Sequence, residues 1–94
     1  MENKKEISQA VALQYNEKNN APKVVAKGNG FIADNIIKAA KQNSVPVYKN
    51  KTLAGMLMAV ELDREIPPDL YTAVAEVLAY VYRMDQKSKP KRIY

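Results

Sequence analysis

The first apolar stretch of the chain alternates between large side chains and small or polar ones. Residues Ala10–Tyr15 read AVALQY, in which Val11, Leu13 and Tyr15 are separated by alanine or glutamine. A repeat of two residues with β-branched and aromatic members predicts a β-strand whose larger side chains are buried on one face. The alanines on the other face are small enough for another element to lie close over them.

A second strand is expected shortly afterwards. Residues 16–20 form a polar turn, and Pro22 stands at the start of the next strand, where its missing N–H costs least. The apolar run Lys23–Lys27 gives that strand, and Gly28 and Gly30 then bracket a chain reversal.

Helical spacing follows the glycines. Apolar residues at positions 32, 36, 39 and 40 predict a helix through Gln42, with Phe31 tucked into the core. Asn43 and Ser44 end this helix, and Val45–Tyr48 gives a short third strand. A strand, a helix and a strand in succession form a βαβ unit, so the second and third strands are expected to be parallel with a right-handed crossover.

Two further helices complete the expected fold. Apolar residues at positions 53, 56, 57 and 60 fall at i, i+3, i+4 and i+7 and predict an amphipathic helix that ends near Leu62. A charged turn, residues 63–65, follows, and Pro67-Pro68-Asp69 begins a last helix that runs to about Met84. The fold class is therefore α/β: a small mixed sheet of three to four strands with three helices packed around it, in the order β-β-α-β-α-α.

Length and charge divide the chain into three parts. A chain of 94 residues suits one small domain, placed at residues 8–84, with a flexible lead-in at 1–7 and a flexible basic tail at 85–94. The net charge is +5, but five basic residues and one acid lie from Arg83 onward, which leaves +1 for residues 1–82. The basic charge therefore favours a solvated end. A small basic nucleic-acid-binding protein that uses this tail remains the alternative function.

The composition excludes most catalytic chemistry. The chain has no cysteine and no histidine, so disulfides, thiol catalysis and the usual catalytic triads cannot form, and zinc lacks both favoured ligand types. The acids of residues 61–69 match no calcium-binding loop, and the Gly28-Asn29-Gly30 turn lacks the third glycine of a dinucleotide loop. We expect no catalytic residue, no cofactor and no metal, and therefore not an enzyme.

Hydropathy and aromatic content bear on location and binding. No apolar run approaches the roughly 20 residues of a membrane span, and residues 1–9 lack the apolar core of a signal peptide, so the protein is expected to be cytoplasmic. Tyr71, Tyr80 and Tyr82 lie on the last predicted helix. Such a helix is most often a core element with hydroxyls at its rim, and a docking face is the alternative.

Four blocks of the sequence, in register, resemble one known family. They are Ala10–Tyr15, Ala21–Gly28, Val45–Val47 and Glu65–Tyr82, and they are similar to the cytoplasmic domain of the FlhB family. These proteins are the export-apparatus switch proteins of flagellar and other type III secretion systems. The resemblance implies a small sheet wrapped by helices that takes part in choosing which substrates are exported.

The chain departs from the family at two places. Members of the family cut themselves at an Asn-Pro-Thr-His motif directly ahead of the AVAL strand, where this chain has Lys5, Glu6, Ile7 and Ser8. Self-cleavage is therefore not expected. In the stretch Asn50–Gly55, threonine and glycine replace the proline and arginine that the family more often carries.

The resemblance implies a non-catalytic component or modulator of flagellar or type III export, which contributes to substrate recognition or to specificity switching. Its implied partners are export-gate proteins or exported substrates, with no small-molecule substrate, and membrane contact is expected only through the export apparatus. The residues expected to bind a partner lie in two places on the chain: Val47, Tyr48, Lys49 and Lys51, and then Tyr71 and Tyr82.

Overall fold

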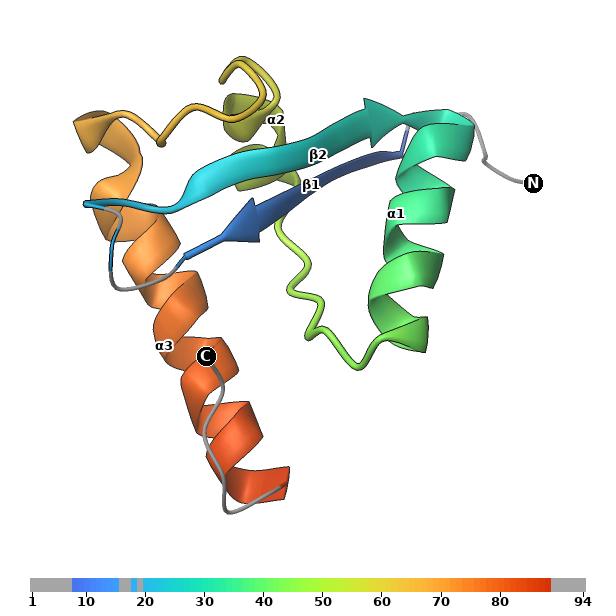
Figure 1. Ribbon diagram of the computed structural model, residues 1–94, viewed down its shortest axis with the longest axis vertical. Coiled ribbons are helices and arrows are strands. Elements are labelled where there is room, and N and C mark those ends of the chain that lie inside the picture. The colour runs from blue at the N-terminus through green and yellow to red at the C-terminus, as the bar shows by residue number, and fades with distance from the viewer. Residues whose placement is uncertain (1–7, 16–17, 19, 89–94) are drawn as a thin grey trace.

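A computed structural model describes residues 8–15, 18 and 20–88 of the chain (Figure 1). The predicted lead-in, residues 1–7, and the end of the predicted tail, residues 89–94, lie outside this part. The elements are, in chain order, β1 (Gln9–Gln14), β2 (Lys23–Asn29), α1 (Gly30–Gln42), α2 (Lys51–Leu57), the 3₁₀ helix η1 (Pro68–Leu70) and α3 (Tyr71–Ser88). The mixed α/β class and the three α-helices agree with the sequence-based prediction.

The two strands form an antiparallel pair. Ala10 lies opposite Gly28 and Val11 opposite Lys27, and the register shifts between Ala12 and Leu13. The Gly30 N–H also donates to the Ser8 carbonyl over 2.9 Å, which extends the pairing up to the first turn of α1. The alternating pattern of AVALQ therefore becomes a strand with two different faces.

Helix α1 covers the small-residue face. Ala10 and its cross-strand neighbour Gly28 share this face, and Ala10 is 9% exposed. A Cβ atom added to Gly28 would lie 2.6 Å from the Cβ of Ile32 in the first turn of α1, so this close approach requires glycine. The expectation that another element lies close over the alanines is confirmed.

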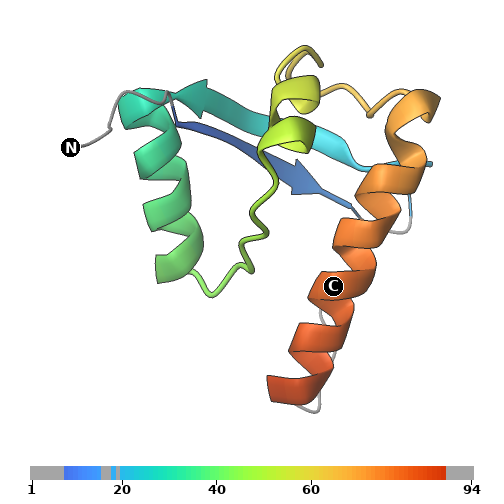
Figure 2. The same cartoon turned by 180° about the vertical axis from the view of Figure 1, so that it is seen from behind.

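The core lies on the opposite face of the sheet. Figure 2 shows α2 in front of the strands and α3 alongside them. Val11 and Leu13 pack against a cluster of buried residues from the turn before β2, β2 itself, α2, the loop before η1, η1 and the start of α3: Ala21, Val24, Leu53, Leu57, Ile66, Leu70 and Val74. Of the apolar positions that predicted the second helix, Leu53 and Leu57 are buried, whereas Met56 is 45% exposed and Val60 lies past the end of α2.

The outer edge of β2 pairs with the loop after α2. Val24 donates its N–H to the Arg64 carbonyl over 3.0 Å and accepts from the Asp63 N–H over 2.7 Å, and Lys23 and Glu65 form an antiparallel bridge. The sequence predicted only a charged turn at residues 63–65. Asp63 has a φ of 66°, a left-handed conformation that aspartate tolerates better than most residues.

The predicted third strand is wrong. Within the described residues the sheet has two strands, and Val45–Tyr48 is irregular and exposed, so there is no parallel pair and no crossover. The physical reason lies in the backbone donors. The Val45 N–H donates to the Ala40 carbonyl at the end of α1 over 2.8 Å, and Pro46 has no N–H. Two consecutive positions therefore cannot donate to a sheet.

The sequence-based prediction for Phe31 is also wrong, because its side chain is 87% exposed instead of buried. The face of α1 that turns inward contains positions 33, 36, 37 and 40, of which Ala33 is fully buried. The predicted face was 32, 36, 39 and 40. The two sets share positions 36 and 40, but position 33 replaces 32 and position 37 replaces 39, so Ile32, which is 57% exposed, and Phe31 face solvent.

The ends of the other two helices also differ from prediction. α2 ends at Leu57 and not near Leu62, while α3 continues to Ser88 beyond the predicted Met84. The Lys27 ammonium group donates to the carbonyls of Met58 and Val60, over 2.8 and 2.7 Å, just past the end of α2. Among the described residues no helix has the length and apolar content to span a membrane.

Candidate functional site

The first group of predicted partner-binding residues lies on the irregular segment between α1 and α2. Val47 and Tyr48 are each 39% exposed, and Lys49 and Lys51 are exposed. The Tyr48 ring meets the Tyr80 ring of α3 edge to face, with centroids 5.0 Å apart and planes at 64°. This geometry is favourable for two aromatic rings and attaches the segment to α3.

The second group, Tyr71 and Tyr82, lies on a different side of α3. At about 100° per residue the two positions are roughly 20° apart around the helix and about 16 Å apart along it. Tyr80 falls roughly opposite to Tyr71 by the same count. The six predicted residues therefore belong to two surfaces of the molecule. One lies beside Tyr80, and the other lies on the side of α3 that carries Tyr71 and Tyr82.

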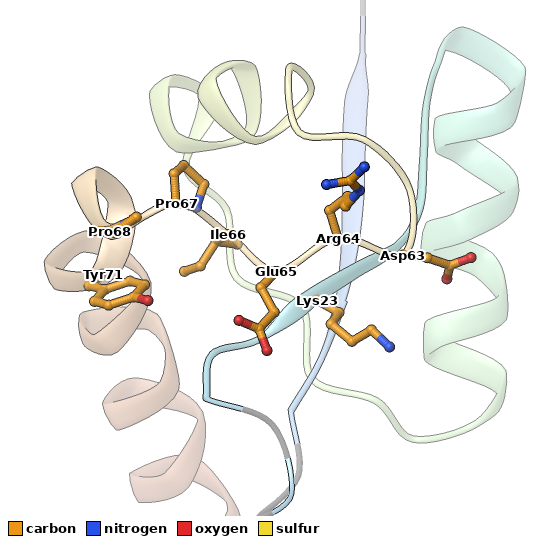
Figure 3. Close-up of a pocket in the computed structure, with 8 residues that line it drawn as sticks. All are labelled: Lys23, Asp63, Arg64, Glu65, Ile66, Pro67, Pro68 and Tyr71. Atoms are coloured by element: carbon orange, nitrogen blue, oxygen red, sulfur yellow. The ribbon is translucent and has the colours of Figure 1, made fainter.

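Tyr71 lines a shallow open hollow at the outer edge of β2 (Figure 3). Its volume is about 570 Å³, and its walls come from Lys23, residues 63–68 and Tyr71. Figure 3 shows the Tyr71 ring on one side and the charged ends of Lys23 and Asp63 pointing outward on the other. A hollow of this shape presents side chains to a large partner but does not enclose a small ligand.

Catalytic geometry is not found in the part of the chain that the structure describes. Over residues 8–15, 18 and 20–83 no polar or charged residue is buried, and no three potential metal ligands come together in the described part of the chain. What the described surface offers is exposed apolar and charged side chains. Side chains of these kinds make up protein–protein interfaces.

Three features of this surface were missed from the sequence. Tyr80 was assigned to the core helix without a partner, Lys27 was given no role, and Phe31 with Ile32 forms an exposed apolar pair. The separation of nine positions between Tyr71 and Tyr80 places the two rings on opposite sides of α3. This spacing is the one feature of the sequence that could have indicated a separate partner, such as Tyr48, for Tyr80. Nothing in the sequence indicates that the Lys27 side chain reaches residues 58 and 60.

Two other sequence-based hypotheses fall partly outside the described residues. Of the four positions that replace the cleavage motif, only Ser8 is described; it is exposed and its carbonyl takes part in the pairing to Gly30. Lys5, Glu6 and Ile7 lie outside. Arg83 is exposed on α3, and residues 89–94 of the basic tail lie outside, so the nucleic-acid alternative stays a prediction.

Comparison with known proteins decides the family. The model of the family described as "FlhB HrpN YscU SpaS Family" matches residues 7–81. The chain belongs to this family. Its resemblance to FlhB, first visible in four blocks, thus extends over nearly all the residues that form the fold, and includes the irregular 45–48 segment.

Relatives of the chain include a short protein and a longer one. YlqH of Bacillus subtilis (strain 168) is 44% identical over 87 residues, which cover 92% of this chain and 94% of YlqH. The flagellar biosynthetic protein FlhB of Aquifex aeolicus (strain VF5) is 48% identical over 87 residues, which cover 90% of this chain but only 23% of that protein. The chain thus spans under a quarter of the length of this FlhB.

Solved structures confirm the fold. The cytoplasmic domain of FlhB from Shewanella putrefaciens aligns with a TM-score of 0.76 and 38% identity, over 79% of this chain and 63% of that one. The C-terminal domain of PscU aligns with a TM-score of 0.73 and 30% identity, over 77% of this chain and 94% of that one. The two-stranded sheet with three helices is therefore the C-terminal domain fold of FlhB-type proteins.

Proposed function

We propose that this protein is a non-catalytic, FlhB-like component or modulator of flagellar or type III protein export. It acts in the cytoplasm and contributes to recognition of export substrates or to specificity switching. The observation that carries the proposal is the family match over residues 7–81, together with the replacement of the cleavage motif by Lys5-Glu6-Ile7-Ser8.

The absence of the motif defines how the protein differs from a switch that cuts itself. In the family, the asparagine side chain attacks its own backbone carbonyl, and this step needs the asparagine that Lys5 replaces. The chain therefore works uncut, as a fixed binding domain. The intact mass of the purified protein is expected to match the full 94 residues, and a stable fragment that begins at Glu6 would contradict this part of the proposal.

The residues proposed to contact a partner are those of the two surfaces described above. Val47, Tyr48, Lys49 and Lys51 provide an apolar and basic surface beside Tyr80, and Tyr71 and Tyr82 provide aromatic groups on the other side of α3. Exposed tyrosines favour protein contacts because each combines a large apolar ring with a hydroxyl group. Export-gate proteins and exported substrates are the proposed partners.

A capture experiment tests this role. The tagged chain is incubated with detergent-solubilised membranes from a flagellated bacterium whose FlhB has been truncated before its cytoplasmic domain, and with membranes that contain intact FlhB. Retention of export-gate proteins by the chain, stronger with the truncated FlhB, supports the proposal. Equal retention by a matched chain of unrelated fold and equal charge would refute it.

A further inference from the structure

We propose that residues 45–51, here called the 45–51 segment, bind an acidic peptide in extended conformation, which adds to the segment as a β-strand. This inference rests on the binding role proposed above and names the chemistry of the partner for one of its two surfaces. Three properties of the segment carry it: its fixed position, its free backbone groups and its charge.

The segment is held in place although it has no regular structure. At its start, the Val45 N–H donates to the Ala40 carbonyl over 2.8 Å, and in its middle the Tyr48 ring packs against Tyr80. At its end, the Asn50 side chain accepts the Leu53 N–H over 3.0 Å and caps α2. A binding segment that is already ordered loses little conformational entropy when a partner arrives.

The backbone in the middle of the segment is available for pairing. Within the described part of the chain, the backbone N–H and C=O groups of Val47, Tyr48 and Lys49 make no hydrogen bond. These residues are exposed, and Val45–Tyr48 has the composition of a strand. An exposed extended segment with unpaired backbone groups is the template that strand addition uses.

The outward side chains define the sequence that fits. In the strand conformation proposed for the bound segment, alternate residues point to the same side, so Val45 and Val47 would lie on the side opposite to Tyr48, which contacts Tyr80. Lys49 continues the same alternation. An added strand would place β-branched or aromatic side chains opposite the valines and a carboxylate opposite the lysine.

The charge of the region selects an acidic partner. Between Asp34 and Glu61 the chain has four lysines and no acidic residue, whereas residues 61–69 contain four acids and one arginine. The 45–51 segment thus lies in a basic stretch of the sequence, and Lys49 is exposed. A nucleic acid is less well matched, because the basic stretch has no arginine, its aromatic ring is already engaged with Tyr80, and its unpaired amides suit another backbone.

The probe is a short blocked peptide in which three alternate residues are two valines and one glutamate, so that one side carries valines opposite Val45 and Val47 and a carboxylate opposite Lys49. It carries a fluorophore and is added to the full-length protein. Anisotropy is expected to report binding that weakens as salt is raised. Lys49→Gln is expected to weaken binding about two- to fivefold, which is the range for one exposed ion pair. Lys23→Gln, which removes the same charge at the outer edge of β2, is the matched control and is expected to leave the affinity unchanged.

Amide hydrogen exchange tests the strand geometry itself. The peptide is expected to protect alternate amides among Val47, Tyr48 and Lys49, and to leave amides of the hollow around Tyr71 unprotected. Equal weakening by the two lysine variants, binding of the matching lysine-containing peptide, tighter binding of a single-stranded oligonucleotide, or binding without amide protection would each overturn the inference.

Failure here is distinguishable from failure of the proposed function. If the chain retains export-gate proteins and Lys49→Gln does not reduce that retention, the inference fails and the export role stands. If the peptide binds as described but no export-gate protein is retained, the peptide-binding surface stands and the export role fails.

Discussion

The contact between Lys27 and the end of α2 predicts a large loss of stability for one substitution. The Lys27 ammonium group joins β2 to the two carbonyls that follow α2, at 2.8 Å to Met58 and 2.7 Å to Val60. It therefore holds the chain that leads into the loop paired with β2. In Lys27→Met the apolar stem remains and both hydrogen bonds are lost.

The magnitude follows from the partners. A hydrogen bond that involves a charged group contributes about 1.5–3 kcal/mol, and removal of the donor leaves two carbonyls partly shielded from water. Because Lys27, Met58 and Val60 are only partly buried, water replaces part of what is lost. We expect Lys27→Met to lower the free energy of unfolding by about 2 kcal/mol, which corresponds to a fall in Tm of roughly 8–16 °C.

Urea unfolding followed by circular dichroism measures this loss, with a thermal scan in parallel. Lys38→Met is the matched control, because Lys38 is exposed in the middle of α1, and its effect is expected to stay within about 0.5 kcal/mol. Lys27→Arg keeps a donor and is expected to fall between Lys27→Met and the native chain. Equal effects of the Lys27→Met and Lys38→Met variants would refute the reasoning.

Three further predictions concern the sheet, a helix cap and the cleavage motif. Gly28→Ala is expected to lower the free energy of unfolding by about 1–3 kcal/mol, because the new methyl group meets the Cβ of Ile32 at 2.6 Å. Urea unfolding measures this loss. An unchanged urea midpoint would contradict the close approach of α1 to β2. Asn50→Ala is expected to lower the free energy of unfolding by about 1 kcal/mol, because the Leu53 N–H loses its acceptor. Asn50→Asp keeps an acceptor and is expected to retain the native stability. An equal loss in both variants argues against the cap. The family motif can be placed directly ahead of β1 by the combined changes Lys5→Asn, Glu6→Pro, Ile7→Thr and Ser8→His. The changed chain is expected to cleave itself after position 5, which mass spectrometry detects. A changed chain that folds and stays intact shows that the motif alone does not cause cleavage here.

The sequence could predict those elements whose pattern reports burial on one face. The alternation of AVALQ specified β1, and Leu53 and Leu57 of the i, i+3, i+4, i+7 set specified the core face of α2, whereas Met56 is exposed and Val60 lies past the end of the helix. Leu53 and Leu57 are both buried in the cluster that this spacing implied. In these elements the local pattern and the tertiary environment agree, so one could be deduced from the other.

The errors arose where backbone geometry decides the outcome. Val45–Tyr48 has the composition of a strand, but the use of the Val45 N–H by α1 and the missing N–H of Pro46 are properties of the folded chain. Phe31 was expected to tuck into the core after a tight turn onto the helix, whereas in the structure Gly30, with a φ of 57°, begins α1 and Phe31 is exposed in its first turn. Two faces of a helix that share half of their positions cannot be told apart from spacing alone.

The candidate site was predicted in part. The sequence identified six exposed or half-exposed residues, but it could not show that Tyr48 contacts Tyr80 or that Tyr71 and Tyr82 lie on another side of α3. Contacts between residues distant in the chain depend on the path of the loops. The hollow beside Tyr71 is likewise built from the pairing of residues 63–66 with β2, which the charged composition of that loop concealed.

The most direct test of the central claim is export itself. The chain is expressed in a flagellated bacterium whose FlhB has been truncated before the cytoplasmic domain, and flagellar proteins are measured in the culture medium. The isolated cytoplasmic domain of the host FlhB serves as the reference. If the chain is an FlhB-like export component, export rises above that of the truncated strain, or falls when the chain is expressed beside intact FlhB. Unchanged export in both strains, with the chain present in folded form, would contradict the account.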